Sequence, residues 1–184
     1  MATIALLSGS LRAESSNSAV VATLRKLIEE GAGGHEATVV PLRDFPPFDE
    51  DVEHAGLPAA LEAARARVSG ADALIVCSPA YNGYPSGVLK NALDWLSRPG
   101  GDSPLTGLPT AVLSASPGQA GGANVQPHVR QILANSGAAA VECDEVAVGN
   151  AISLRTPDGL IEDPAVLSRL AKLVDTVLAA VAAR

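Results

Sequence analysis

Short apolar runs alternate with longer amphipathic stretches along the whole chain, and no other feature restricts the possible fold as strongly. Five short apolar runs bounded by turn residues predict strands at residues 3–7, 37–42, 71–77, 110–115 and 138–148. Five stretches with apolar residues at helical spacing predict helices at residues 16–30, 57–68, 86–97, 124–135 and 164–183. This alternation predicts a doubly wound α/β fold, in which helices cover both faces of a parallel sheet.

The chain is expected to form one domain, residues 1–184, because it contains no repeat, low-complexity tract or linker. Hydrophobic residues make up 47% of the sequence and charged residues 18%, which excludes intrinsic disorder. No apolar run reaches the roughly 20 residues of a membrane-spanning helix, so no membrane association is expected. A formal net charge of -7 argues against nucleic acid as a partner, because phosphate binding needs a basic surface.

The N-terminal residues lack the basic start of a secretory signal, and they fit a first strand instead. Cys77 and Cys143 both lie in or beside apolar runs, and no CxxC motif or Cys/His cluster suggests a zinc site. We therefore expect reduced cysteines in the core of a cytoplasmic protein.

The loop after the first expected strand is rich in groups that bind anions, and ligands of open α/β sheets bind at such strand ends. Residues 8–18 contain five serines, an asparagine and an arginine. Hydroxyl and backbone N–H groups at a helix N-terminus suit a phosphate, and Arg12 can add a bidentate hydrogen bond. The GxxxxGK[ST] and GxGxxG motifs are both absent, which excludes a nucleotide-hydrolysing P-loop and a dinucleotide fingerprint. A loop that merely caps the helix is the alternative.

Two further loops have compositions that suit a planar ring. The loop at residues 78–87 combines Tyr81 and Tyr84 with an amide and two glycines, and it suits a heteroaromatic ring that contacts backbone groups. The loop at residues 114–123 has three glycines and two serines, which let the backbone approach a ligand closely. An ordinary Pro/Gly turn and a flexible crossover loop are the alternatives.

The sequence offers no evident acid–base or nucleophilic machinery. His35, His54 and His128 are scattered, none accompanies an evident nucleophilic serine, and the GxSxG motif is absent. The acidic residues of the expected loop at 44–53 fit a solvated surface better than a metal site. A phosphorylated, planar redox cofactor agrees with this pattern, because such a cofactor supplies the reactivity itself.

The three loops carry three motifs in order: GSLRxxSxN at residues 9–17, SPxYN at 78–82 followed by GVLKNALDWLSR at 87–98, and SPGxxGGA at 116–123. In these motifs the chain resembles the NAD(P)H-dependent FMN reductases, which include bacterial quinone and chromate reductases of the flavodoxin-like fold. The resemblance runs from about residue 3 to about residue 145. It implies the strand order 2-1-3-4-5, one non-covalent FMN per subunit, and NADPH or NADH as co-substrate.

The resemblance also implies a role for residues in each loop. It assigns the FMN phosphate to Ser10, Arg12, Ser15, Asn17 and Ser18. It places the edge of the isoalloxazine ring along Pro79, Ala80, Tyr81, Asn82 and Gly83. It sets the third loop beside the ring through Ser116, Pro117 and Gly118.

Ala80 departs from the family pattern, because family members commonly have glutamate there. This departure puts in doubt the contacts around the flavin or between subunits. The helix at 86–97 is expected to be mainly structural, and such helices often help to build the family's homodimers or homotetramers. Phe45, Phe48 and Tyr84 could cover the exposed face of the ring, across a subunit boundary, or could pack under a loop.

The function that this pattern predicts is an oxidoreductase that passes electrons from a nicotinamide nucleotide, through bound FMN, to a small-molecule acceptor. A quinone, a free flavin, an azo compound and a metal oxyanion are all compatible acceptors. One alternative is a flavodoxin-like electron carrier without NAD(P)H activity of its own. A second is a binding module that has lost FMN. The sequence does not distinguish NADH from NADPH.

Overall fold

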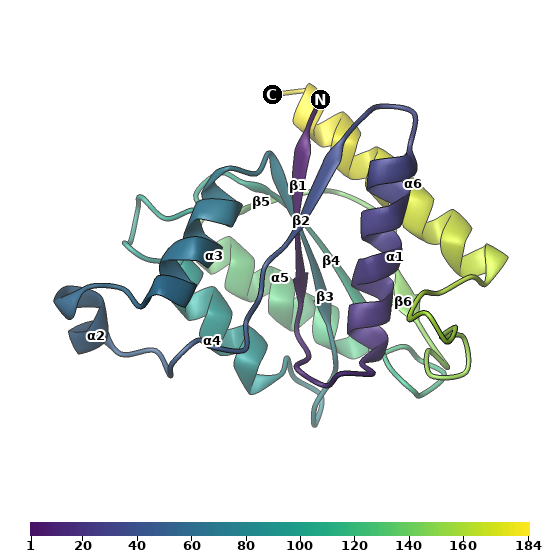
Figure 1. Ribbon diagram of the computed structural model, residues 1–184, viewed down its shortest axis with the longest axis horizontal. Helices are drawn as coiled ribbons and strands as arrows, with labels where there is room; N and C mark the ends of the chain where they lie inside the picture. The colour runs from purple at the N-terminus through teal and green to yellow at the C-terminus, as the bar shows by residue number, and fades with distance from the viewer.

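A parallel β-sheet forms the centre of the molecule in the computed structural model, which describes residues 1–184 (Figure 1). The sheet order is β2-β1-β3-β4-β5, with β6 also paired to β4, and every strand pair is parallel. This confirms the predicted strand order. The strands are β1 (Thr3–Ser8), β2 (Glu36–Val39), β3 (Ala73–Ser78), β4 (Pro109–Ala115), β5 (Ala139–Ala140) and β6 (Ala147–Val148).

Helices cover both faces of the sheet, as the amphipathic stretches predict. They are α1 (Ser16–Glu30), α2 (Glu50–Ala55), α3 (Ala59–Ser69), α4 (Gly87–Leu96), α5 (Gln126–Asn135) and α6 (Pro164–Ala182), with a 3₁₀ turn η1 (Ala123–Val125) before α5. Figure 1 shows α1 and α6 on one side of the sheet and α3, α4 and α5 on the other. None of these helices combines the length and the apolarity needed to cross a bilayer.

The central strands are apolar on both sides because each side contributes to a separate core. Ile4 and Leu6 of β1 pack in the cluster that includes residues of α1 and α6. Ala5 and Leu7 belong to the cluster that includes residues of α3, α4 and α5. Successive side chains of a strand point to opposite faces, so a strand between two helical layers is apolar throughout.

The expected fifth strand at 138–148 is wrong as a single element, because the structure divides it into β5 and β6. Thr110 of β4 is the register partner of Ala140, and Ser114 is the partner of Ala147. The edge segment therefore uses more residues than β4 over the same length and cannot pair without interruption. The interruption includes three exposed acids, Glu142, Asp144 and Glu145.

The acidic segment expected to be a loop at 44–53 ends in the first residues of the short helix α2. Asp49 caps this helix by accepting a hydrogen bond from the backbone N–H of Asp51 at 2.9 Å. The acidic side chains of its first turn also interact favourably with the helix dipole. Glu53 accepts a hydrogen bond from Nε of Arg98 at 2.8 Å, which links α2 to the end of α4.

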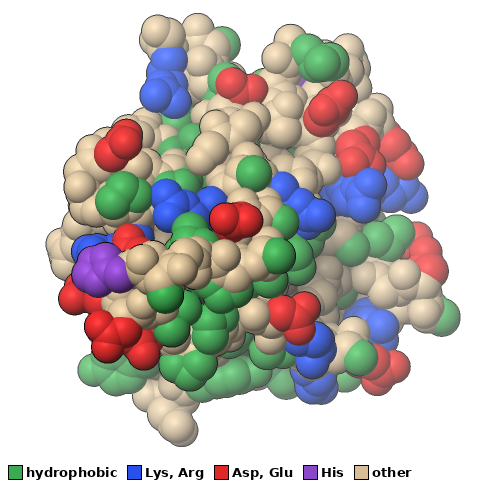
Figure 2. Space-filling view, turned by 60° about the vertical axis from the view of Figure 1, so that its left-hand side comes forward, with side chains coloured by type: hydrophobic (Ala, Val, Ile, Leu, Met, Phe, Trp, Pro, Cys, Tyr) green, Lys and Arg blue, Asp and Glu red, His purple; other side chains and the backbone are tan.

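Charged side chains of both signs are interspersed over the face that carries α2, α3 and α4 (Figure 2). Phe45 and Phe48 lie in the chain that leads to α2. Phe45 packs against the core, and Phe48 packs edge-on against Trp95 with ring centroids 4.9 Å apart. The indole N–H of Trp95 donates to the carbonyl of Pro46 at 2.8 Å. The two phenylalanines therefore pack under a loop in this chain.

Candidate functional site

The three loops singled out in the sequence meet at one edge of the sheet, beyond the carboxyl ends of β1, β3 and β4. In Figure 1 this is the lower edge, where the purple chain turns from β1 into α1. A pocket of about 210 Å³ opens between the loops. It is lined by Ser10, Arg12, Ser15, Ser16, Asn17, Pro79, Ala80, Tyr81, Ala115, Ser116 and Pro117.

Most residues predicted to contact a cofactor line this pocket. The predicted residues that do not line it are Ser18, Asn82, Gly83 and Gly118. The prediction missed Ser16, which occupies an unspecified position of the first motif, and Ala115, which lies in the third expected loop just before its motif. The position of Ser16 in the first turn of a helix after a serine-rich loop is the signal that could have identified it.

Helix α1 begins at the pocket because Ser15 caps it. Oγ of Ser15 accepts hydrogen bonds from the backbone N–H groups of Asn17 and Ser18, at 3.1 and 3.4 Å. The hydroxyl hydrogen of Ser15 stays available to a ligand, because a hydroxyl group both donates and accepts.

Asn17 holds three strand ends together from a buried position. Its Nδ2 donates to the carbonyl of Ala115 at 3.1 Å, and its Oδ1 accepts from Sγ of Cys77 at 3.2 Å. Burial raises the pKa of the Cys77 thiol, which keeps it protonated and able to donate. The Asn17 side chain therefore fixes the relative positions of the loops after β1, β3 and β4.

Several donors in and beside the pocket have no partner within the protein. The backbone N–H groups of residues 10–14 donate to no other group, and Arg12 forms no ion pair. Oγ of Ser16 is the one buried side-chain oxygen or nitrogen without a hydrogen-bond partner. Buried polar groups are nearly always paired, so the free hydroxyl of Ser16 is unusual. Together with the solvent-facing backbone donors and the cationic side chain beside it, it fits a bound anion.

The loop after β1 has a defined shape because neighbouring elements hold it. Nη2 of Arg43 donates to the carbonyl of Leu11 at 2.6 Å, and the Ser86 hydroxyl donates to the carbonyl of Gly9. A Cβ atom at Gly9 would lie 2.8 Å from Cδ of Pro79. Glycine therefore lets the first loop pack directly on the second.

The second loop forms a tight hairpin at the mouth of the pocket. Tyr81 and Tyr84 pair through two backbone hydrogen bonds, at 2.9 and 3.1 Å. Asn82 and Gly83 between them have φ angles of 53° and 87°. Positive φ at both central residues is the geometry of a type I′ turn, for which Asn-Gly is the preferred sequence.

The third loop is held by the edge strand β6. The backbone N–H of Ser116 donates to Val148, and that of Ala151 donates back to Ser116, both at 3.1 Å. Gly121 has a φ angle of 61°, and a Cβ there would lie 2.7 Å from the backbone of Val148. The residues that interrupt the predicted fifth strand thus lead to β6, and β6 supports the third loop of the site.

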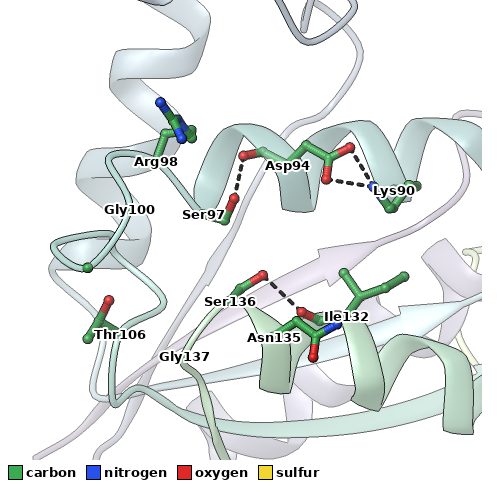
Figure 3. Close-up of a pocket in the computed structure, with 11 residues that line it drawn as sticks. Lys90, Asp94, Ser97, Arg98, Gly100, Thr106, Ile132, Asn135, Ser136 and Gly137 are labelled. Atoms are coloured by element: carbon green, nitrogen blue, oxygen red, sulfur yellow. Dashed lines mark hydrogen bonds and ion pairs between the residues drawn. The ribbon is translucent and has the colours of Figure 1, made fainter. Parts of the chain in front are cut away.

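A second pocket, of about 500 Å³, lies at the opposite edge, between the C-terminal ends of α4 and α5 (Figure 3). Its cationic groups are already paired with acids. Lys90 donates to both carboxylate oxygens of Asp94 at 2.7 Å, and Arg98 bonds to Glu53. The smaller pocket at the carboxyl edge has the free donors and is therefore the candidate site.

The chain matches the model of a known protein family over residues 2–153, and the family is described as NADPH-dependent FMN reductase. It is 42% identical to an NAD(P)H-dependent FMN reductase of Pseudomonas aeruginosa over 127 residues, which are 69% of this chain and 66% of that protein. It is 36% identical to a quinone reductase of Pseudomonas putida over 160 residues, which are 87% of this chain and 84% of the relative. The match to the first relative spans just under two thirds of that protein's length.

Solved structures agree in fold. FerB of Paracoccus denitrificans, a flavoenzyme NAD(P)H:(acceptor) oxidoreductase, superposes with a TM-score of 0.88 at 28% identity, over 99% of this chain and 98% of FerB. A flavodoxin of Pseudomonas aeruginosa superposes with a TM-score of 0.59 at 18% identity, over 96% of this chain and 99% of the flavodoxin, which supports the flavodoxin-like fold alone. The chain belongs to the NADPH-dependent FMN reductase family, whose cofactors are FMN and a nicotinamide nucleotide.

Proposed function

We propose that the protein oxidises NADPH or NADH and reduces a quinone, with FMN held between the loops after β1, β3 and β4. The observation that carries this proposal is the cluster of unpartnered donors around the buried hydroxyl of Ser16. Relatives described as quinone reductases, from Pseudomonas putida and Escherichia coli, support the choice of acceptor. Free flavins, azo compounds and metal oxyanions are the other acceptors to be tested.

The loop after β1 is proposed to hold the FMN phosphate. Arg12 supplies the positive charge, Ser10 and Ser16 supply hydroxyl donors, and the backbone N–H groups of residues 10–14 complete the set. Such groups at a helix N-terminus bind phosphate without a lysine. Asn17 acts beneath them by fixing the loop, a role that its two hydrogen bonds support.

The other two loops are proposed to hold the ring. Pro79, Ala80 and Tyr81 lie on one side of the pocket, and Ser116 and Pro117 lie on another. When it is bound, FMN supplies hydride acceptance from the nicotinamide ring and transfer of two electrons to the acceptor. The protein needs to position both substrates and to exclude water, which agrees with a pocket that has no paired carboxylates or histidine.

The overall reaction converts NAD(P)H, a proton and a quinone into NAD(P)⁺ and a hydroquinone. The visible spectrum of the purified protein, recorded before and after anaerobic addition of NADH or NADPH, tests it. We expect a flavin spectrum that is bleached by the nucleotide and restored by a quinone. A flavin spectrum that neither nucleotide bleaches would indicate an electron carrier, and failure to retain added FMN would contradict the proposal.

We further propose that the protein works in the cytoplasm as a homodimer or homotetramer. The free thiols of Cys77 and Cys143 agree with a reducing compartment. Size-exclusion chromatography with light scattering tests the assembly, and a monomeric mass in the presence of FMN would contradict it.

A further inference from the structure

The hairpin after β3 presents two tyrosines on the same side. Tyr81 and Tyr84 are direct partners in its antiparallel bridge, and directly opposed residues of such a pair project from one face of the ribbon. Tyr81 lines the candidate pocket. Tyr84 therefore continues the wall of the pocket outward, beyond the volume that the pocket itself encloses.

The outer tyrosine is held by a histidine of another element. The rings of Tyr84 and His128 lie with centroids 4.6 Å apart and planes tilted by 31°. His128 belongs to the first turn of α5. The tip of the hairpin also lies close to η1, because a Cβ added at Gly83 would be 3.7 Å from Nδ2 of Asn124. The position of Tyr84 is thus fixed although its surface is open.

Exposed apolar side chains gather around this edge of the sheet. Tyr81 is 53% exposed and Tyr84 is 61% exposed. Apart from Met1, every large exposed hydrophobic residue lies at or beyond the carboxyl end of a strand; the others are Leu11, Val39 and Ile152. Figure 2 shows hydrophobic side chains gathered toward the lower part of the face in view, the end at which these loops lie.

The size of the pocket leaves a substrate to be held outside it. About 210 Å³ is less than the roughly 300–1,000 Å³ of typical ligand sites, so the pocket accommodates only part of a mononucleotide. A second flat ring needs a further wall. Tyr84 and His128 offer aromatic faces together with an O–H and an N–H donor.

From these observations we propose that Tyr84 and His128 form the outer wall of the substrate site and select a flat ring that carries carbonyl oxygens. The quinone and the nicotinamide ring share this chemistry. The inference rests on the proposed function and adds specificity-determining residues to it. Tyr84 supplies the contact surface, and His128 is a positioning residue that supports it.

Binding to the oxidised holoenzyme tests the wall without turnover, because no electrons pass to a quinone or to NAD⁺ from an oxidised flavin. A 1,4-naphthoquinone and NAD⁺ are titrated separately by calorimetry. Tyr84→Ala and His128→Gln are each expected to raise the Kd of at least one ligand about threefold to tenfold, the range expected for a lost aromatic contact. Tyr84→Phe keeps the stacked ring and should retain most of the affinity.

His54→Ala is the matched control, because His54 is an exposed histidine on α2 that contacts neither loop. The Kd of FMN should stay within twofold of the wild-type value in all variants. Steady-state KM values for the quinone and for NAD(P)H then identify which ring uses the wall, since the KM of each substrate that contacts it rises.

Unchanged Kd values in both Tyr84→Ala and His128→Gln, with an active wild-type protein, would overturn this inference and leave the proposed function intact. A wild-type protein that retains no FMN or oxidises no NAD(P)H would instead overturn the proposed function. Light scattering separates a third case. If Tyr84→Ala breaks an oligomer as it weakens binding, the pair belongs to a contact between subunits and the inference is wrong.

Discussion

Ser16 has a buried hydroxyl group without a partner in the first turn of α1. Such a group is unfavourable in the apoprotein and useful only when a ligand accepts its hydrogen. Ser16→Ala should therefore leave the free energy of unfolding of the apoprotein unchanged or higher. It should lower the affinity for FMN about twofold to tenfold, as expected for one lost hydrogen bond.

Urea denaturation of the apoprotein and a fluorescence titration with FMN measure these two effects. Ser168→Ala, at an exposed serine of α6, is the control and should change neither. A drop in apoprotein stability with FMN affinity unaltered would give Ser16 a structural role.

Arg12 is the cationic side chain of the pocket that no acid neutralises. A hydrogen bond to a charged group contributes about 1.5–3 kcal/mol, so Arg12→Ala should weaken FMN binding roughly tenfold to a hundredfold. Arg25→Ala makes the same change of charge at an exposed pair with Glu29 and should have little effect. An unchanged FMN affinity in Arg12→Ala would remove this residue from the site.

The two cysteines should differ in reactivity. Burial raises the pKa of Cys77 and of Cys143, and Arg130 partly opposes the shift at Cys143. A raised pKa means less thiolate at a given pH, so labelling of native protein by a thiol reagent should be slow and should speed up as pH rises. Cys143, which is only partly buried, should react first. Cys77 should react only after denaturation, and rapid labelling of both thiols in native protein would contradict this.

The sequence was enough to predict which types of residue form the site, but not which role each residue has. Serines and an arginine before a helix indicate an anion site whatever the fold. The bonds of Asn17, however, reach groups 60 and 98 residues away in the sequence. Only the folded sheet brings Cys77 and Ala115 to it. The family resemblance implies a phosphate contact for Asn17, and that role stays a prediction.

At the scale of elements, one buried amide adds polar bonds to the apolar packing of α5 against the sheet. Nε2 of Gln126 donates to Ser114 Oγ and to the carbonyl of Val146, both at 2.9 Å. Gln126→Ala would remove the donor to Ser114 Oγ and would leave the Val146 carbonyl with only the backbone N–H of Ser114. It should lower the free energy of unfolding by about 1–3 kcal/mol. Gln131→Ala, at an exposed glutamine of the same helix, should change it by less than about 0.5 kcal/mol. Equal effects in chemical denaturation would show that the buried amide adds no stability.

Most elements could be predicted because their periodicity reports burial directly. The helix at 16–30 has the predicted bounds, and the central strands lie within a residue or two of theirs. The prediction of one continuous edge strand at 138–148 was wrong for a physical reason. Its apolar residues suggested continuous pairing, but pairing depends on the register with β4, which cannot be read from the sequence. The acidic helix α2 was not predicted because its stability comes from an N-cap and from Arg98, and not from an apolar face.

For the whole molecule, FMN should act as a stabilising ligand. A ligand at about 100 times its Kd adds about 2.7 kcal/mol to the free energy of unfolding. For a chain of this size each kcal/mol raises Tm by about 2–4 °C, so saturation should raise Tm by about 5–10 °C. Differential scanning calorimetry of apoprotein with added FMN measures it, and riboflavin, which lacks the phosphate, should raise Tm less. Equal shifts would contradict a phosphate site.

Both borders of the sheet are poor templates for another strand. β2 has four residues, and its last carbonyl, at Val39, already accepts from Arg67 at 2.7 Å. The other border consists of two-residue strands separated by an irregular, acidic segment. Short, interrupted or charged borders prevent molecules from joining sheet to sheet. The chain should therefore resist fibrous aggregation at high concentration, and any assembly of copies has to use helices or loops.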